Sequence, residues 1–183
     1  MKKRITIILI LLASLFAQGC VTTSNVIVND ATTFPTVTGT DLHGDERTFP
    51  DYFSSKRTIV VVAFQRWQQS LCDEWYKHIE EYNQANNHSA FFEIPTISKM
   101  NTFTRWFIYN GMRGGIKDDK MRSQVVTLHI DKEPFKKALK IDTEETVFVY
   151  VMDEDGLIIE SIKGKWNEDK WALAKAALDK GKE

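Results

Sequence analysis

Apolar and polar positions alternate along the chain in blocks that predict an α/β domain. The apolar run 59–64 has no polar face, which is typical of a strand covered on both sides. From Leu71 the spacing changes to three- and four-residue intervals. This period predicts an amphipathic helix whose inner face carries Leu71, Trp75, Ile79 and Tyr82.

The remaining blocks continue this alternation. Residues 34–53 mix apolar and turn residues, which predicts a β-hairpin followed by a short helical turn. We then expect strands at 91–97, 125–130, 147–152 and 157–162, and helices that start near Asn101 (ending at Gly111 or at Gly114-Gly115), at 132–139 and at 167–179. This order needs a central mixed sheet with helices on both faces. We therefore expect a three-layer α/β sandwich with an N-terminal β-hairpin.

The first twenty residues differ from the rest of the chain. Three basic residues at 2–4 precede the uncharged run 5–17, and Gly19 stands directly before Cys20. This arrangement resembles a bacterial lipoprotein signal. Because the apolar run is shorter than the roughly 20 residues that span a bilayer core, a permanent transmembrane helix is the weaker interpretation.

The lipoprotein interpretation divides the chain into a signal peptide (1–19), a tether (20–33) and a domain (34–183). The resemblance implies that Cys20 begins the mature chain and carries acyl chains, such as palmitate, on its sulfur and on its amino group. Several acyl chains hold a protein firmly in a membrane. Since Val21 rather than Asp follows the cysteine, we expect an outer-membrane lipoprotein that faces the periplasm of the bacterial envelope.

Charge and cysteine content limit the partners of the domain. The chain has 24 Lys and Arg against 25 Asp and Glu, and losing the three basic residues of the leader leaves a net charge of −4. A mildly acidic domain is poorly suited to binding nucleic acid or an anionic leaflet by general electrostatics.

With Cys20 lipidated, Cys72 is the remaining cysteine, so no internal disulfide can form. We expect an envelope or membrane protein as partner.

Several features resemble a thioredoxin-like fold of the redoxin branch. They are a strand that ends at Phe64, a loop that carries Trp67, a helix from Leu71 and a late hairpin closed at Asp155-Gly156. Three stretches of the second half, 111–113, 126–139 and 147–156, resemble the family of mitochondrial ATP synthase assembly factors and its bacterial relatives. The likeness covers roughly residues 35–175 and implies a chaperone-like role in the assembly of a membrane complex.

Two departures from the thioredoxin pattern bear on activity. Thioredoxins place Cys-x-x-Cys directly after the tryptophan, where the helix start lowers the pKa of the first thiol and the second thiol resolves the mixed disulfide. Here these places hold Gln68, Gln69, Ser70 and Leu71. Redox-active members also carry a cis-proline before the strand that faces the motif, and Val147 or its neighbour takes that place. We therefore expect a redox-inactive, cofactor-free binding protein rather than an enzyme.

Cys72 supports the enzymatic alternative. Its position in the first helical turn favours a thiolate, but the adjacent Asp73 and Glu74 oppose one, and its neighbours belong to the buried stripe. The favoured interpretation is that Cys72 is buried and packs as a small hydrophobic residue. A single-cysteine thiol oxidoreductase or peroxidase that uses Cys72 stays as the alternative, and a structural envelope lipoprotein is the third hypothesis.

Partner contacts are expected at two surfaces. Trp and Arg dominate interface energetics, and both occur in the loop before the first helix, although inward packing of Trp67 is equally open. The residues of this first surface are Arg66, Trp67, Gln68 and Gln69, and those of the second are Arg105, Trp106 and Arg113. The four histidines have no ligand spacing, so we expect no metal site.

Overall fold

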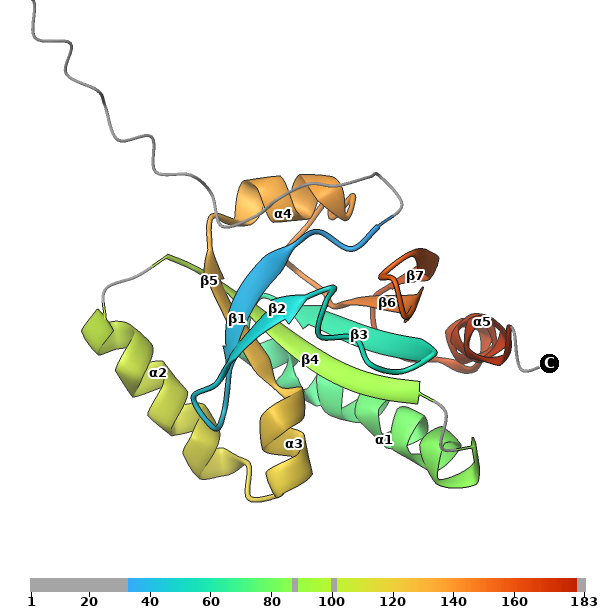
Figure 1. Cartoon of the computed structure of the whole chain (residues 1–183), viewed down its shortest axis with the longest axis horizontal. Helices are drawn as coiled ribbons and strands as arrows, with labels where there is room; N and C mark the ends of the chain where they lie inside the picture. Colours follow the sequence, from blue (N-terminus) through green and yellow to red (C-terminus); the bar gives the residue numbers. More distant parts are fainter. Residues whose placement is uncertain (1–32, 87–88, 100–101, 181–183) are drawn as a thin grey trace, which may run out of the picture.

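The computed structural model describes residues 33–86, 89–99 and 102–180, with positions 102–107 and 109 described by their backbone (Figure 1). The predicted signal peptide, Cys20 and nearly all of the predicted tether lie outside the described residues. Within the described ranges, no helix has both the length and the apolar character that crossing a membrane requires.

The strands and helices follow the expected order. The elements are β1 (Val37–Asp41), β2 (Glu46–Phe49), β3 (Arg57–Ala63), the 3-10 turn η1 (Arg66–Gln68), α1 (Gln69–Asn86), β4 (Ser89–Ser98), α2 (Thr102–Gly115), α3 (Asp119–Gln124), β5 (Val126–Ile130), α4 (Lys132–Ala138), β6 (Phe148–Asp153), β7 (Ile158–Lys163) and α5 (Glu168–Asp179). The short helix α3 was not predicted. Of the two ends proposed for α2, the structure has the later one, at Gly115.

The strands form one mixed sheet in the order β2-β1-β5-β4-β3-β6-β7. β3 pairs in parallel with β4, and β4 pairs in parallel with β5. The front hairpin joins this sheet through an antiparallel pairing of β1 with β5, and β6 and β7 form the expected antiparallel hairpin. The α/β architecture with helices on both faces of a mixed sheet is therefore confirmed.

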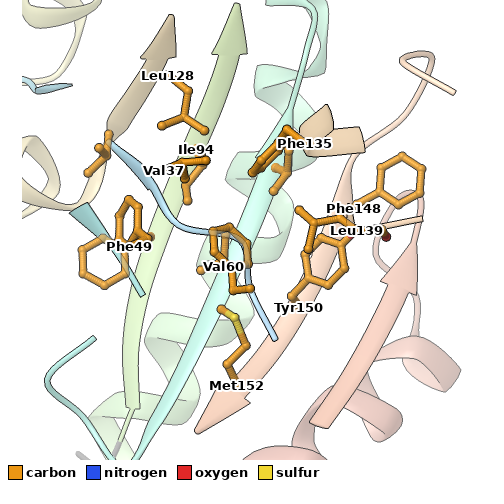
Figure 2. Close-up of a cluster of buried hydrophobic side chains, with 14 of the residues drawn as sticks. Val37, Phe49, Val60, Ile94, Leu128, Phe135, Leu139, Phe148, Tyr150 and Met152 are labelled. Carbon is orange, nitrogen blue, oxygen red and sulfur yellow. Dashed lines mark hydrogen bonds between the residues drawn. The ribbon is translucent and has the colours of Figure 1, made fainter. Parts of the chain in front are cut away.

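One face of the sheet is covered by α4 and by the turn after β2. Phe34, which precedes β1, packs edge-to-face against Phe49 and Phe135, with ring centroids 6.2 and 5.9 Å apart. Figure 2 shows this core, where side chains from β2, β3, α4 and β6 converge. β3 contributes Val60 and Val62 to this core, and Ile59, Val61 and Ala63 to the core on the opposite face, so both of its sides are buried.

α1 and α5 cover the other face of the sheet. The buried residues of α1 are Cys72, Trp75, Ile79 and Tyr82. The Trp75 indole also donates a hydrogen bond to the carbonyl of Gly164 at 3.1 Å, so it fixes α1 against the segment before α5. Among the described residues, the members of both hydrophobic cores lie between positions 34 and 178.

Candidate functional site

The place that a dithiol would occupy lies between β3 and α1, and here it is held by a buried glutamine. The Gln68 side chain is completely buried. Its Oε1 accepts hydrogen bonds from the backbone N–H groups of Phe64 at 2.8 Å and Gln65 at 3.2 Å, and its Nε2 donates to the carbonyl of Glu144 at 2.7 Å. We expected Gln68 to contact a partner; this expectation is corrected, because its polar atoms satisfy buried backbone groups of the loop.

The segment that receives Gln68 is itself fixed. The Glu144 carboxylate pairs with Lys132 and, at 3.1 Å, with Lys136, both on α4. The Lys132 ammonium also lies 5.8 Å from the centre of the Phe64 ring. These contacts tie the loop to the end of β3, to α4 and to the segment before β6.

The exposed residues of this loop form a surface that we call the α1 loop surface: Gln65, Arg66, Trp67, Gln69 and Ser70. Trp67 has 55% of its surface exposed, more than any other large hydrophobic side chain in the described part of the chain. The sequence left open whether Trp67 packs inward or faces outward, and in the structure it faces outward. Tryptophan is one of the residues that contribute most to binding at protein interfaces, so the exposed Trp67 side chain is a candidate contact for a partner.

Cys72 lies directly beneath this surface but is closed off from solvent. Its exposure is 0%, and it belongs to the core beneath α1, as its apolar neighbours predict. Burial, together with the negative charges of Glu93 and Asp73, raises the pKa of the Cys72 thiol well above its usual range. Because the thiolate is the nucleophile, this environment opposes thiol chemistry at Cys72.

Glu93 on β4 is a site residue that the sequence reasoning missed. It is 3% exposed on the α1 side of the sheet, and its carboxylate accepts a hydrogen bond from the Gln69 amide at 3.2 Å. The same amide donates to Asp73 at 3.0 Å. Desolvation, with a smaller effect of Asp73, raises the pKa of Glu93 to about 7. The sequence signal that could have identified Glu93 is that it is the single carboxylate within an apolar predicted strand.

The second predicted surface is only partly described. Arg113 is exposed near the end of α2, whereas positions 105 and 106 are placed by the helix backbone alone. The carbonyl of Arg113 accepts a hydrogen bond from Arg122 on α3 at 3.3 Å. The loop that carries the α1 loop surface is tied instead to α4 and to the segment before β6, through Phe64 and Gln68. The two surfaces therefore rest on different parts of the fold.

Metal ligands do not gather anywhere in the described ranges, where no three His, Cys, Asp or Glu side chains could hold an ion. His78 stacks on the Trp166 ring with centroids 3.9 Å apart, and His43 lies 3.8 Å from a carboxylate oxygen of Asp119. These two histidines are thus occupied by surface packing and pairing.

The sequence shows which family the chain is related to. The sequence pattern of the ATP10 protein family matches residues 21–159 of this chain. The chain belongs to the ATP10 protein family. No match was found among curated proteins.

Solved structures similar to this ATP10 family member share its thioredoxin-like fold. The thioredoxin domain of a thiol-disulfide oxidoreductase from Bacteroides vulgatus is 17% identical, with a TM-score of 0.53 over 82% of this chain and 99% of that one. A thioredoxin-family thiol:disulfide interchange protein from Chlorobium tepidum is 18% identical, with a TM-score of 0.50 over 82% and 98%. A member of the Sco family of cytochrome c oxidase assembly proteins is 10% identical, with a TM-score of 0.54 over 80% and 94%. At these identities the likeness concerns the fold.

Proposed function

We propose that this protein is a lipid-anchored, redox-inactive thioredoxin-like domain that binds a protein during the assembly of a membrane complex. The proposal rests on one observation: a glutamine, Gln68, stands at the place where thioredoxins have a dithiol cysteine. This buried glutamine is hydrogen-bonded to the loop backbone and to the carbonyl of Glu144, and an exposed tryptophan projects from the same loop. A preorganised loop loses little conformational entropy on docking, so its contacts contribute more fully to affinity.

The family assignment supports an assembly role, and the geometry supports binding over catalysis. A one-cysteine oxidoreductase would need Cys72 exposed and acidic, whereas Cys72 is buried with a raised pKa. A structural lipoprotein without a specific partner would not need a fixed aromatic contact. The partner is a subunit of a membrane complex, for which the ATP synthase is the first candidate.

Site-specific photo-crosslinking in the native envelope tests the binding proposal. A photoreactive phenylalanine analogue at Trp67 should give one adduct that contains a subunit of a membrane complex. The matched control is Leu173 on α5, which is 52% exposed, nearly as much as Trp67. The adduct should be absent from position 173 and should disappear in a Gln68→Ala background. Adducts of equal yield and identity from both positions would contradict a specific surface.

We further propose that lipid on Cys20 anchors the protein to the inner face of the outer membrane. The support is the leader pattern, a basic start followed by a short apolar run and Gly19-Cys20. Labelled palmitate should be incorporated into the full chain but not into a Cys20→Ser variant. The labelled protein should separate with outer membranes on a density gradient; recovery with inner membranes would overturn the assignment of the membrane.

A further inference from the structure

β7 forms one edge of the sheet. In the strand order it comes last, next to β6 (Figure 1). An antiparallel strand turns its backbone N–H and C=O groups alternately toward its neighbour and away from it. Just before β7, the Asp153 N–H donates to the Leu157 carbonyl at 3.2 Å. Just after it, the Gly164 N–H donates to the Val147 carbonyl at 2.8 Å. These two bonds fix which residues of β7 face outward.

Three residues of β7 turn their backbone groups away from β6. They follow from the two bonds, the register of β6 with β7 and the bulge in it, and they are Ile158, Ser161 and Lys163. Within the described residues, no strand covers these groups. The Ser161 N–H donates instead to the carboxylate of its neighbour Glu160 at 3.0 Å. Such a row of backbone groups is a template for one more strand.

The chain that enters the domain already meets this edge. Thr33 forms an antiparallel bridge with Leu157. The Phe34 N–H donates to the carbonyl of Gly156 at 2.8 Å. Both backbone polar groups of Leu157 bond to Asp153 at the end of β6, the carbonyl at 3.2 Å and the N–H at 2.9 Å. Thr33 therefore lies on the side of Leu157 that faces away from β6.

The direction of this bridge decides what can follow it. In antiparallel pairing, the residues before Thr33 run alongside the residues after Leu157. We propose that residues 28–32, which lie outside the described residues, form an added antiparallel strand on the outer edge of β7. The segment is attached at the start of this edge, so its local concentration there favours it over a strand from another molecule.

The outward groups of β7 set the register of the added strand. Every second residue of the segment pairs with one of them: Thr32 with Ile158, Asp30 with Ser161, and Val28 with Lys163. The bulge of β7 takes up the one extra residue on its side. Val and Thr are β-branched and favour strands. The charge of Asp30 suits a new edge strand, because charged residues there oppose pairing with further chains.

This pairing has a consequence for the α1 loop surface. Lys163 pairs with Phe148, and Phe148 pairs with Val62 near the end of β3, shortly before the α1 loop surface. The chain leading back to Cys20 therefore leaves the edge of β7 at the end of the sheet that carries Trp67. This orientation rests on the proposed function: with lipid on Cys20, Trp67 is turned toward the membrane that holds the partner.

Disulfide formation and amide exchange test the pairing. Both use residues 20–183 with Cys20→Ser and Cys72→Ala, so that the introduced cysteines are the only thiols.

The first experiment compares two cysteine pairs under mild oxidation. Asp30→Cys with Ser161→Cys should close an intramolecular disulfide, because opposite strand positions bring the two Cβ atoms within disulfide range. The matched control is Asp30→Cys with Glu154→Cys, since Glu154 is exposed in the turn beside Thr33 and an unpaired segment would reach both positions. The first pair should react about tenfold faster. Equal rates would overturn the proposal.

The second experiment breaks the added strand. Val28→Pro removes an N–H that the pairing uses. It should lower the disulfide rate to that of the control pair and quicken amide exchange at Ser161 and Lys163 by about tenfold. Val26→Pro lies before the paired residues and should leave both unchanged. Exchange that is as fast in the parent chain as in Val28→Pro would overturn the proposal.

A second copy of the chain is the alternative occupant of the edge. A disulfide between chains, or a dimer in sedimentation velocity that Ser161→Pro abolishes, would overturn the proposal. In the lipidated chain, Val28→Pro should lower the yield of the crosslink from Trp67, and an unchanged yield would overturn the orientation. If the parent chain gives no crosslink, the proposed function fails while the disulfide result still decides the pairing.

Discussion

Arg66-Trp67 and Arg105-Trp106 are the same dipeptide in two settings. The first belongs to a loop that Gln68 ties to β3 and to the segment before β6. The second belongs to α2, where a Cβ built at Gly111 or Gly114 would meet no neighbouring atom. An exposed tryptophan on a loop tied to the fold offers a fixed contact for one protein, whereas the described end of α2 meets few other parts of the chain. The predictions below test this difference between the α1 loop surface and α2.

The largest effect is expected at Gln68. Gln68→Ala leaves two backbone N–H groups and one carbonyl without their buried partner, each worth roughly 1–3 kcal/mol. We expect the free energy of unfolding to fall by about 4 kcal/mol, measured by urea denaturation, with loss of the crosslink from position 67. Gln84→Ala is the control, because Gln84 is an exposed glutamine of α1, and it should change stability little. Equal effects of the two substitutions would show that the loop does not depend on Gln68.

The pH dependence of stability should reveal Glu93. Its pKa is raised from 4.5 to about 7, so the folded state binds a proton more tightly than the unfolded chain. Stability is therefore greatest below pH 4.5 for this group and falls as pH rises to about 7. The expected loss is on the order of 3 kcal/mol. Glu93→Gln should remove this slope in urea titrations across pH; an unchanged slope would contradict the assignment.

Substitution of Cys72 should have a smaller effect on stability. Cys72→Ala removes a buried sulfur and should cost about 1 kcal/mol, while Cys72→Ser adds an unpaired hydroxyl and should cost about 2 kcal/mol. Both variants should keep the crosslink from Trp67. Thermal unfolding and crosslink yield measure these outcomes, and loss of the crosslink in a folded Cys72→Ala variant would revive a functional thiol.

The smallest effect is expected at α2. Because a Cβ at Gly111 meets no neighbouring atom, Gly111→Ala should stabilise the helix locally by roughly 0.5–1 kcal/mol. Amide exchange within α2 should slow by about twofold to fivefold, converted from that free energy, while the urea midpoint of the whole domain stays the same. A lowered midpoint would mean that α2 packs closely on the core.

The local pattern of apolar and polar residues was sufficient to predict the buried elements of the fold. The apolar run of β3 and the stripe of α1 are read from neighbouring residues, and both are found where they were predicted. The pairing of β1 with β5 joins positions 40 and 127, and no local signal reports it. The short helix α3 has no buried residue, so it lacks the apolar period that predicts helices.

The candidate site was predicted in position but not in mechanism. Trp67 stands in the expected loop, yet its outward orientation was one of two open choices. Gln68 is a polar residue whose partners lie as far away as Glu144, so its burial follows from tertiary structure alone. Glu93 was read as part of a strand, and its proximity to Cys72 depends on how α1 crosses the sheet.

The central claim is that the dithiol position serves binding and that the remaining thiol takes no part in chemistry. Alkylation of Cys72 across pH, in residues 20–183 with Cys20→Ser, tests it most directly. We predict no reaction in the native protein through the range where ordinary thiols titrate, near pH 8.5, and rapid reaction after denaturation. Fast native alkylation with a midpoint below that value would contradict the account and favour a thiol enzyme.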